Sequence, residues 1–197
     1  MATQINGLQR LALNEYNTYD HWRTFCLNHG INADYLFNNQ CLDPPKLLWS
    51  QYNLTLVTGN GYAYGVWTLK RDENAKLPFV AMGGDAPAMS RKTLIKRGDC
   101  VVFAPSGLNY TGHIAFADED YNGTDSLKCL GQNQGQGTAS GTPSNIETLN
   151  LRTFLGAFRN IYWRTSPTPP PPTPPSGTRQ GSFPFVLYSH KFRNYGR

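Results

Sequence analysis

A run of proline residues near the end of the chain limits its fold more than any other feature. Residues 166–176 read Ser-Pro-Thr-Pro-Pro-Pro-Pro-Thr-Pro-Pro-Ser. Because proline has a fixed φ and no backbone N–H to donate, such a run forms an extended spacer rather than a helix or a sheet. It therefore divides the 197 residues into a main domain over 1–165, a linker over 166–176 and a short tail over 177–197.

The tail is too short to build a core of its own. It nevertheless carries several large apolar side chains, namely Phe183, Phe185, Val186, Leu187, Tyr188 and Phe192. We therefore expect residues 177–197 to dock on a partner, on another copy of the chain, or back onto the main domain.

Within the main domain, helical spacing comes first and strand-like runs follow. Residues 5–28 have apolar positions at helical spacing and no proline, and residues 46–52 form a second, shorter helical pattern. From residue 98 the pattern becomes short β-rich runs bounded by Gly, Asn, Asp and Pro, over residues 99–104, 113–117, 126–130 and 154–163. Helices followed by strands predict an α+β fold with an antiparallel sheet. Residues 59–97 carry loop signals and no clear assignment.

The charge of the chain is modest and scattered. The net charge is +5 and the pI is near 9.1, but no dense basic stripe is present, so we expect no nucleic-acid partner. The N-terminus has neither a basic region nor an apolar region of a secretory signal. No apolar stretch reaches the roughly 18–20 residues that span a bilayer. We therefore expect synthesis in a cytoplasm and no membrane insertion.

The four cysteines show no metal-like spacing, and three of them lie in apolar runs as core residues would. Cys41 differs, because it lies just ahead of the 46–52 helix. A helix N-terminus stabilises a thiolate and can receive the oxyanion that forms when a carbonyl is attacked. Pro44 and Pro45 are compatible with a first helical turn. The structural alternative is that Cys41 is a core residue near the cap.

A base and its orienting partner are also present. His113 opens a strand directly after a glycine-containing loop, which suits a general base projecting into a cleft. The strand that contains Cys129 ends in adjacent amides, Gln132 and Asn133, and such an amide can hold an imidazole in its working tautomer. The structural alternative for this segment is a polar loop.

These segments, taken in order, resemble the CHAP family, the cysteine- and histidine-dependent amidohydrolases and peptidases of phages and bacteria. The motifs are Gln40-Cys41-Leu42-Asp43, Gly98-Asp99-Cys100-Val101-Val102-Phe103, Gly112-His113-Ile114-Ala115 and Leu130-Gly131-Gln132-Asn133-Gln134-Gly135. The resemblance covers about residues 20–163 and implies a papain-like α+β fold that cleaves amide bonds in peptidoglycan.

The resemblance also implies a role for each site residue. Cys41 would attack the carbonyl, His113 would accept its proton, and Asn133, ahead of Gln132, would orient His113. Some family members carry a glutamate where this chain has Gly131. The third catalytic residue is therefore open.

A calcium loop is predicted just upstream. The residues Asn32, Asp34, Leu36, Asn38 and Asp43 fall at positions 1, 3, 5, 7 and 12 of a twelve-residue loop, the spacing of an EF-hand. Leu36 would offer only its backbone carbonyl, and Phe37 stands where the usual turn glycine is expected. A structural turn is the alternative.

The leading hypothesis is a phage peptidoglycan hydrolase, either an endopeptidase or an N-acetylmuramoyl-L-alanine amidase. It would be made in the host cytoplasm and would reach the cell wall as a released endolysin or in the virion tail. Phage tail proteins would then be partners of residues 177–197. The alternatives are a structural virion component with an inactive CHAP domain and a cytosolic cysteine protease that acts on proteins.

Overall fold

The computed structural model describes residues 3–107, 109–134 and 142–163. The linker over 166–176 and the tail over 177–197 lie outside these residues, so that division of the chain and the docking of the tail stay predictions. Within the described ranges, no helix is both long enough and apolar enough to span a bilayer.

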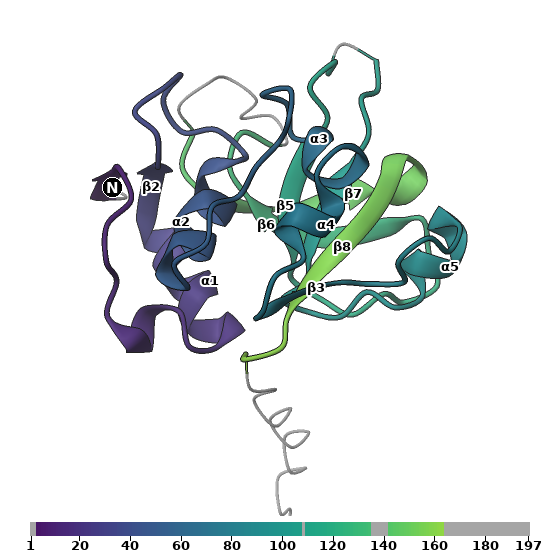
Figure 1. Cartoon of the computed structure of the whole chain (residues 1–197), viewed down its shortest axis with the longest axis horizontal. Coiled ribbons are helices and arrows are strands. Elements are labelled where there is room, and N and C mark those ends of the chain that lie inside the picture. Colours follow the sequence, from purple (N-terminus) through teal and green to yellow (C-terminus); the bar gives the residue numbers. More distant parts are fainter. Residues whose placement is uncertain (1–2, 108, 135–141, 164–197) are drawn as a thin grey trace, which may run out of the picture. The chain divides into compact units, whose positions relative to one another are not determined.

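Two helices and a small parallel sheet lie together on one side of the domain (Figure 1). Helix α1 spans Tyr19–Asn28 and helix α2 spans Asp43–Gln51. Strand β1 (Thr3–Asn6) pairs in parallel with strand β2 (His29–Asn32). Thr18 caps the N-terminus of helix α1, because its hydroxyl accepts a hydrogen bond from the backbone N–H of His21 at 3.2 Å.

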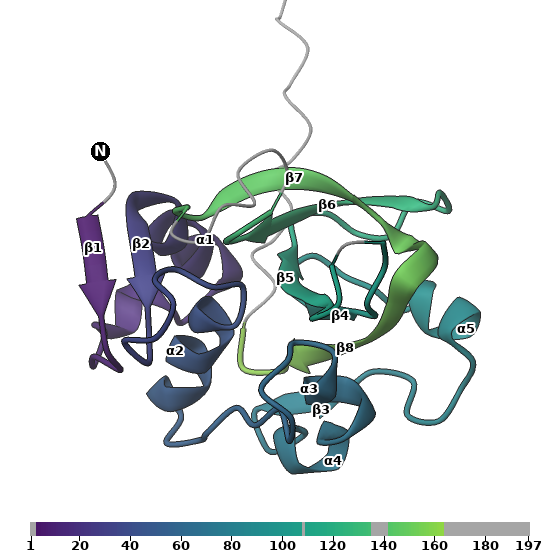
Figure 2. The same ribbon diagram turned by 90° about the horizontal axis from the view of Figure 1, so that it is seen from above.

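The other side of the domain is a six-stranded antiparallel sheet with the order β3–β8–β4–β5–β6–β7. Seen from above, the sheet is strongly curved (Figure 2). Its strands are β3 (Phe79–Ala81), β4 (Cys100–Phe103), β5 (His113–Ala117), β6 (Ser126–Gly131), β7 (Asn145–Asn150) and β8 (Phe154–Asn160). The connections hold α3 (Gly65–Thr68), α4 (Arg71–Asn74), α5 (Ala88–Lys92) and the 3₁₀ turns η1 (Leu13–Glu15) and η3 (Leu151–Thr153).

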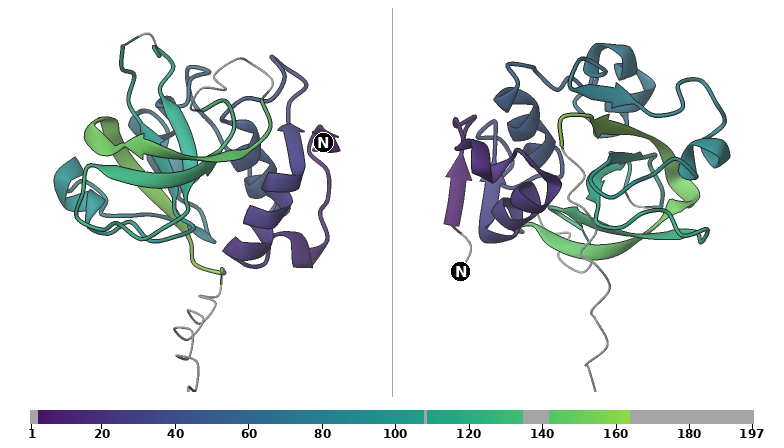
Figure 3. Two further views of the ribbon diagram at one scale, coloured as in Figure 1. Left: turned by 180° about the vertical axis from the view of Figure 1, so that it is seen from behind. Right: turned by 90° about the horizontal axis from the view of Figure 1, so that it is seen from below.

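The central strands are buried on both faces, because alternate side chains enter two different cores. On one face, Trp22 of α1 contacts Phe116, and Trp49 of α2 stacks on Phe79 with ring centroids 3.5 Å apart. On the other face, the curved sheet encloses a second cluster that includes Val101 and Ala115. The views from behind and below show α1 and α2 beside the sheet (Figure 3). The start of β5 and the start of α2 are therefore held by a continuous core.

The predicted α+β class with an antiparallel sheet is confirmed. The predicted helix over 5–28 is wrong in its first half, because residues 3–6 form β1 and Leu8 is exposed rather than packed on a helical face. The second helix and the four strands are found close to their predicted bounds. The three cysteines assigned to the core, Cys26, Cys100 and Cys129, are fully buried.

Candidate active site

Cys41 lies in the turn that leads into α2 and is half-buried. Two hydrogen bonds close this turn: the Gln40 N–H donates to the Asp43 carboxylate at 2.6 Å, and the Asp43 N–H donates to the Gln40 carbonyl at 3.1 Å. Pro44 and Pro45 occupy the first turn of α2, where a backbone N–H would have no intrahelical partner. The predicted position of Cys41 immediately ahead of a helix is therefore confirmed.

The sulfur of Cys41 meets the start of strand β5. The backbone N–H of Ile114, the residue directly after His113, lies near this sulfur. Burial raises the pKa of the Cys41 thiol to about 11, while the Ile114 N–H lowers it and the nearby Asp43 carboxylate raises it. With that pKa, only about one thiol in 10⁴ is ionised at pH 7, so the resting site holds a thiol rather than a thiolate.

His113 is fixed by Gln134. The imidazole Nε2 lies 3.1 Å from Gln134 Oε1. The amide nitrogen of Gln134 donates to the carbonyls of Cys129 and Asn145, both at 2.9 Å, so its oxygen must face the imidazole. This network assigns the proton to Nε2 and leaves Nδ1 with a free lone pair. Burial lowers the pKa of His113, and the Gln134 contact acts in the opposite direction.

His113 therefore donates its hydrogen bond to Gln134, whereas Asn133 and Gln132 were the amides predicted to orient it. Asn133 has a positive φ of +55°, and its amide nitrogen lies 3.5 Å from Gln40 Oε1. The positive φ of Asn133 reverses the direction of the backbone after β6. The side chain of the next residue, Gln134, then lies against the imidazole. No spacing rule marks this reversal in the sequence.

Gly131 makes room for the Gln134 amide. A Cβ atom at residue 131 would lie 2.8 Å from Gln134 Oε1 and 3.1 Å from the Cβ of Ala115. The missing side chain at residue 131 thus leaves the space in which the Gln134 oxygen lies and accepts the hydrogen bond of His113.

Gln132 is fully buried, and its amide holds the turn that carries Cys41. Its oxygen accepts the Ile31 N–H at 2.7 Å, and its nitrogen donates to the carbonyls of Ile31 at 2.8 Å and Gln40 at 3.0 Å. The amide thereby connects β2, the end of β6 and the residue before Cys41. Gln132 is a positioning residue in this structure rather than a partner of the imidazole.

The two acidic residues of the predicted calcium loop, Asp43 and Asp34, are engaged in other hydrogen bonds and ion pairs. The two oxygens of Asp43 accept the N–H groups of Ala33 at 3.1 Å and Gln40 at 2.6 Å. Burial raises the pKa of Asp43 to about 7, against the effect of those N–H groups. Asp34 pairs with the Lys46 ammonium at 2.5 Å and accepts the Leu36 N–H at 2.9 Å.

One observation favours a ligand in this loop: Asn32 Oδ1 is buried without a hydrogen-bond partner among the described residues. Calcium requires six to eight oxygen ligands. Asn38, the remaining side chain of the predicted set, is exposed. The described residues contain no group of three or more acidic, His or Cys side chains arranged to hold a metal. As arranged, the set does not fit calcium unless the Lys46–Asp34 pair and the bonds of Asp43 are broken.

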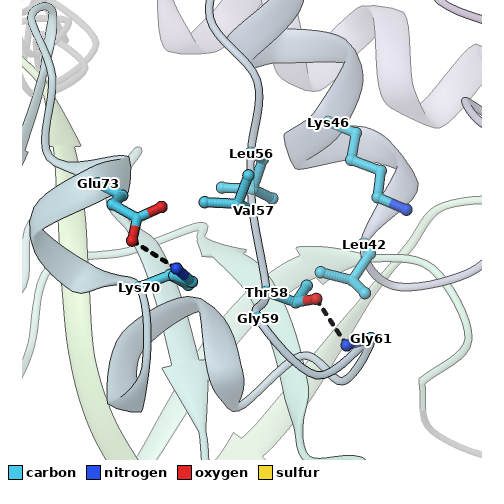
Figure 4. Close-up of a pocket in the computed structure, with 9 residues that line it drawn as sticks. All are labelled: Leu42, Lys46, Leu56, Val57, Thr58, Gly59, Gly61, Lys70 and Glu73. Carbon is cyan, nitrogen blue, oxygen red and sulfur yellow. Dashed lines mark hydrogen bonds and ion pairs between the residues drawn. The ribbon is translucent and has the colours of Figure 1, made fainter.

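A cavity of about 560 Å³ has Leu42 in its wall (Figure 4). Leu42 directly follows Cys41 in the chain. The walls of the cavity come from α2, the 56–61 loop and the start of α4, with the residues Leu42, Lys46, Leu56, Val57, Thr58, Gly59, Gly61, Lys70 and Glu73. The volume is in the range of small-molecule sites, roughly 300–1,000 Å³.

No protein-family model and no curated protein matches the chain. Among solved structures, the chain is similar to the crystal structure of a wild-type endolysin, LysIME-EF1, with a TM-score of 0.56 and 18% identity over 76% of this chain. The chain spans 64% of the length of that endolysin. The N-acetylmuramoyl-L-alanine amidase from Staphylococcus aureus has a TM-score of 0.40 and 18% identity, over 65% of this chain and 33% of that one. At this identity, the likeness to the endolysin shows a shared fold.

Proposed function

We propose that this chain is a peptidoglycan hydrolase in which Cys41 is the nucleophile and His113 the general base. The observation that carries the proposal is the position of the Cys41 sulfur. The sulfur lies near the N–H of Ile114, which directly follows His113, and Gln134 holds the His113 imidazole in one tautomer. The order of the motifs and the endolysin-like fold support peptidoglycan as the substrate.

The chemistry would begin from a neutral thiol and a neutral imidazole. Nδ1 of His113 accepts the thiol proton as the sulfur attacks the carbonyl carbon of the scissile amide. The backbone N–H groups of Cys41 and Leu42 then stabilise the oxyanion. His113 returns the proton to the leaving amine, and a thioester to Cys41 remains. Water, deprotonated by His113, attacks this thioester, and the acid product leaves as the thiol regains its proton.

The remaining polar residues would position this pair without taking part in bond changes. Gln134 keeps the imidazole oriented and stabilises the imidazolium that forms during attack. Gln132 and Asp43 hold the backbone on either side of Cys41. We assign no step to a metal ion.

The bond that is cleaved is either a peptide bond of the stem or the amide between sugar and peptide. For a phage protein, synthesis in the host cytoplasm would be followed by action on the wall, as a released endolysin or from the virion tail. Phage tail proteins remain the proposed partners of residues 177–197.

The test is the loss of turbidity of purified Gram-positive cell walls. The wild type should clear the walls, and both Cys41→Ala and His113→Ala should reduce the rate by about 10³-fold or more. His21→Ala is the matched control, because His21 is exposed on α1 and should be dispensable. Cleavage of casein but not of walls would indicate a general cysteine protease. No clearing of several wall types, together with copurification with phage tail proteins, would favour a structural virion component.

A further inference from the structure

Three tyrosines from two separate loops gather next to the candidate active site. Tyr62 and Tyr64 come from the segment before α3, and Tyr110 comes from the β4–β5 connection. The rings of Tyr62 and Tyr64 stack with centroids 6.0 Å apart, and Tyr110 meets Tyr62 edge-on, also at 6.0 Å. Tyr62 is 40% exposed and Tyr110 is 71% exposed, so much of the cluster faces solvent.

The backbone ties this cluster to His113. The N–H of Tyr64 donates to the carbonyl of Thr111 at 3.3 Å. Gly112, the residue before His113, has a φ of +68°, and a Cβ atom there would lie 3.0 Å from the Cβ of Tyr64 and 2.4 Å from the carbonyl oxygen of Phe103. Only glycine allows so close an approach. The two loops are therefore joined directly ahead of the proposed base, and α3 lies at the same end of the domain as the start of β5 (Figure 1).

The two loops that carry the cluster contain no charged residue, and the charged side chains that line the cavity beside Gly59 and Gly61 are Lys46, Lys70 and Glu73. The sequence has no Asp, Glu, Lys or Arg between Lys46 and Lys70, and none between Asp99 and Asp118. The polar groups in the two loops are amides and hydroxyls, such as Asn60, Asn109 and Thr111. A site for an anionic polymer or an anionic lipid surface would be expected to carry several cationic side chains on the loops themselves. The chemistry of these loops instead matches a neutral ligand with apolar faces and hydroxyl edges.

We propose that Tyr62, Tyr64 and Tyr110 form a platform that binds the glycan strand beside the thiol site. A sugar ring offers C–H faces that stack on tyrosine rings, and its hydroxyls can pair with the phenol groups. An N-acetylated sugar is neutral, as the two loops require. The assignment of this glycan to peptidoglycan rests on the proposed function, and the platform would then hold the sugar while the attached peptide reaches Cys41.

The experiment measures binding separately from hydrolysis. The full chain with Cys41→Ala is titrated with N-acetylchitotetraose, a soluble neutral N-acetylated glycan, by calorimetry or by tyrosine fluorescence. Adding Tyr62→Ala or Tyr110→Ala should weaken binding by about tenfold each. The matched control is Tyr162→Ala, which removes a 58% exposed tyrosine that follows β8. Equal thermal unfolding midpoints would show that the variants are folded.

The outcomes separate this inference from the proposed function. Weaker binding in the two platform variants, with unchanged binding in Tyr162→Ala, supports the platform whether or not cell walls are cleaved. No binding of the tetrasaccharide at millimolar concentration, or the same loss in all three variants, overturns the platform. Thiol-dependent clearing of walls would leave the proposed function standing in that case.

Discussion

Replacement of Gln134 by leucine tests the orientation of His113 most directly. Leucine has a similar volume but forms none of the three hydrogen bonds of the glutamine amide. The carbonyls of Cys129 and Asn145 each lose a donor, and each loss costs about 1–2 kcal/mol for a buried group. We therefore expect the free energy of unfolding to fall by about 2–4 kcal/mol. The imidazole stays in the site but loses its fixed tautomer.

The fall in kcat of Gln134→Leu should be larger than the fall in the fraction of folded protein can explain. General acid–base catalysis contributes about 10²–10⁴-fold, and an unoriented imidazole should retain part of it. We expect kcat to fall by about 10²-fold at a temperature where the variant is fully folded, with little change in KM. The assay is the initial rate of wall clearing over a range of substrate concentrations, with the folded fraction measured in parallel by circular dichroism.

Two further variants separate orientation from a merely structural role. Asn133→Ala should change kcat by less than about threefold, because Gln134 accepts the hydrogen bond of the imidazole and the amide nitrogen of Asn133 lies 3.5 Å from Gln40 Oε1. Gln134→Glu keeps an acceptor for the Nε2 proton and adds a negative charge, which favours the imidazolium and raises the pKa of His113. As the pH is lowered, the activity of Gln134→Glu should therefore begin to fall at a higher pH than the activity of the wild type. Full activity of Gln134→Leu, with loss of activity in Asn133→Ala, would refute the assignment.

Three more predictions follow from the same geometry. Gly131→Ala should lower kcat by about tenfold and should also lower the thermal midpoint, because the new Cβ would displace the Gln134 amide from its hydrogen bonds; kcat and the thermal midpoint check this. The rate should rise with pH along a single acid limb, with its midpoint below the ordinary histidine value of about 6.5, since burial lowers the pKa of His113 and the neutral imidazole is the base; a pH–rate profile shows it. Chelation of calcium should leave wall clearing unchanged, and loss of activity in chelator would instead establish the calcium loop. Lys46→Met should cost less than about 1 kcal/mol of stability, because the Lys46–Asp34 pair is partly exposed.

The positions of Cys41 and His113, the proposed nucleophile and base, could be predicted from the sequence because their settings are local. Cys41 precedes two prolines that fit a first helical turn, and His113 follows a glycine and opens an apolar run. Both settings are short-range patterns of residue type, and the structure has them as predicted.

The partner of the base could not be predicted, because it depends on a backbone reversal. Asn133 adopts a positive φ, and that single dihedral angle decides which amide reaches the imidazole. Strand β7 was missed for a related reason: most of its side chains are only partly buried, so its alternation of apolar and polar residues is weak. Strand β1 falls partly within the helix predicted over 5–28, because its pairing with β2 is non-local and leaves no pattern in the nearby sequence.

The position of the nucleophile depends on buried amides and backbone groups. Gln132 holds the Gln40 carbonyl, Asp43 holds the Gln40 N–H, and the Ile114 N–H lies near the sulfur and lowers the pKa of the thiol. These groups belong to α2, β5 and the end of β6, so the site forms only when the helices have docked on the sheet. A thiol with a pKa of about 11 is a weak nucleophile on its own. It follows that reactivity should appear only with substrate bound and His113 in place, and that generic thiol reagents should modify Cys41 slowly at neutral pH.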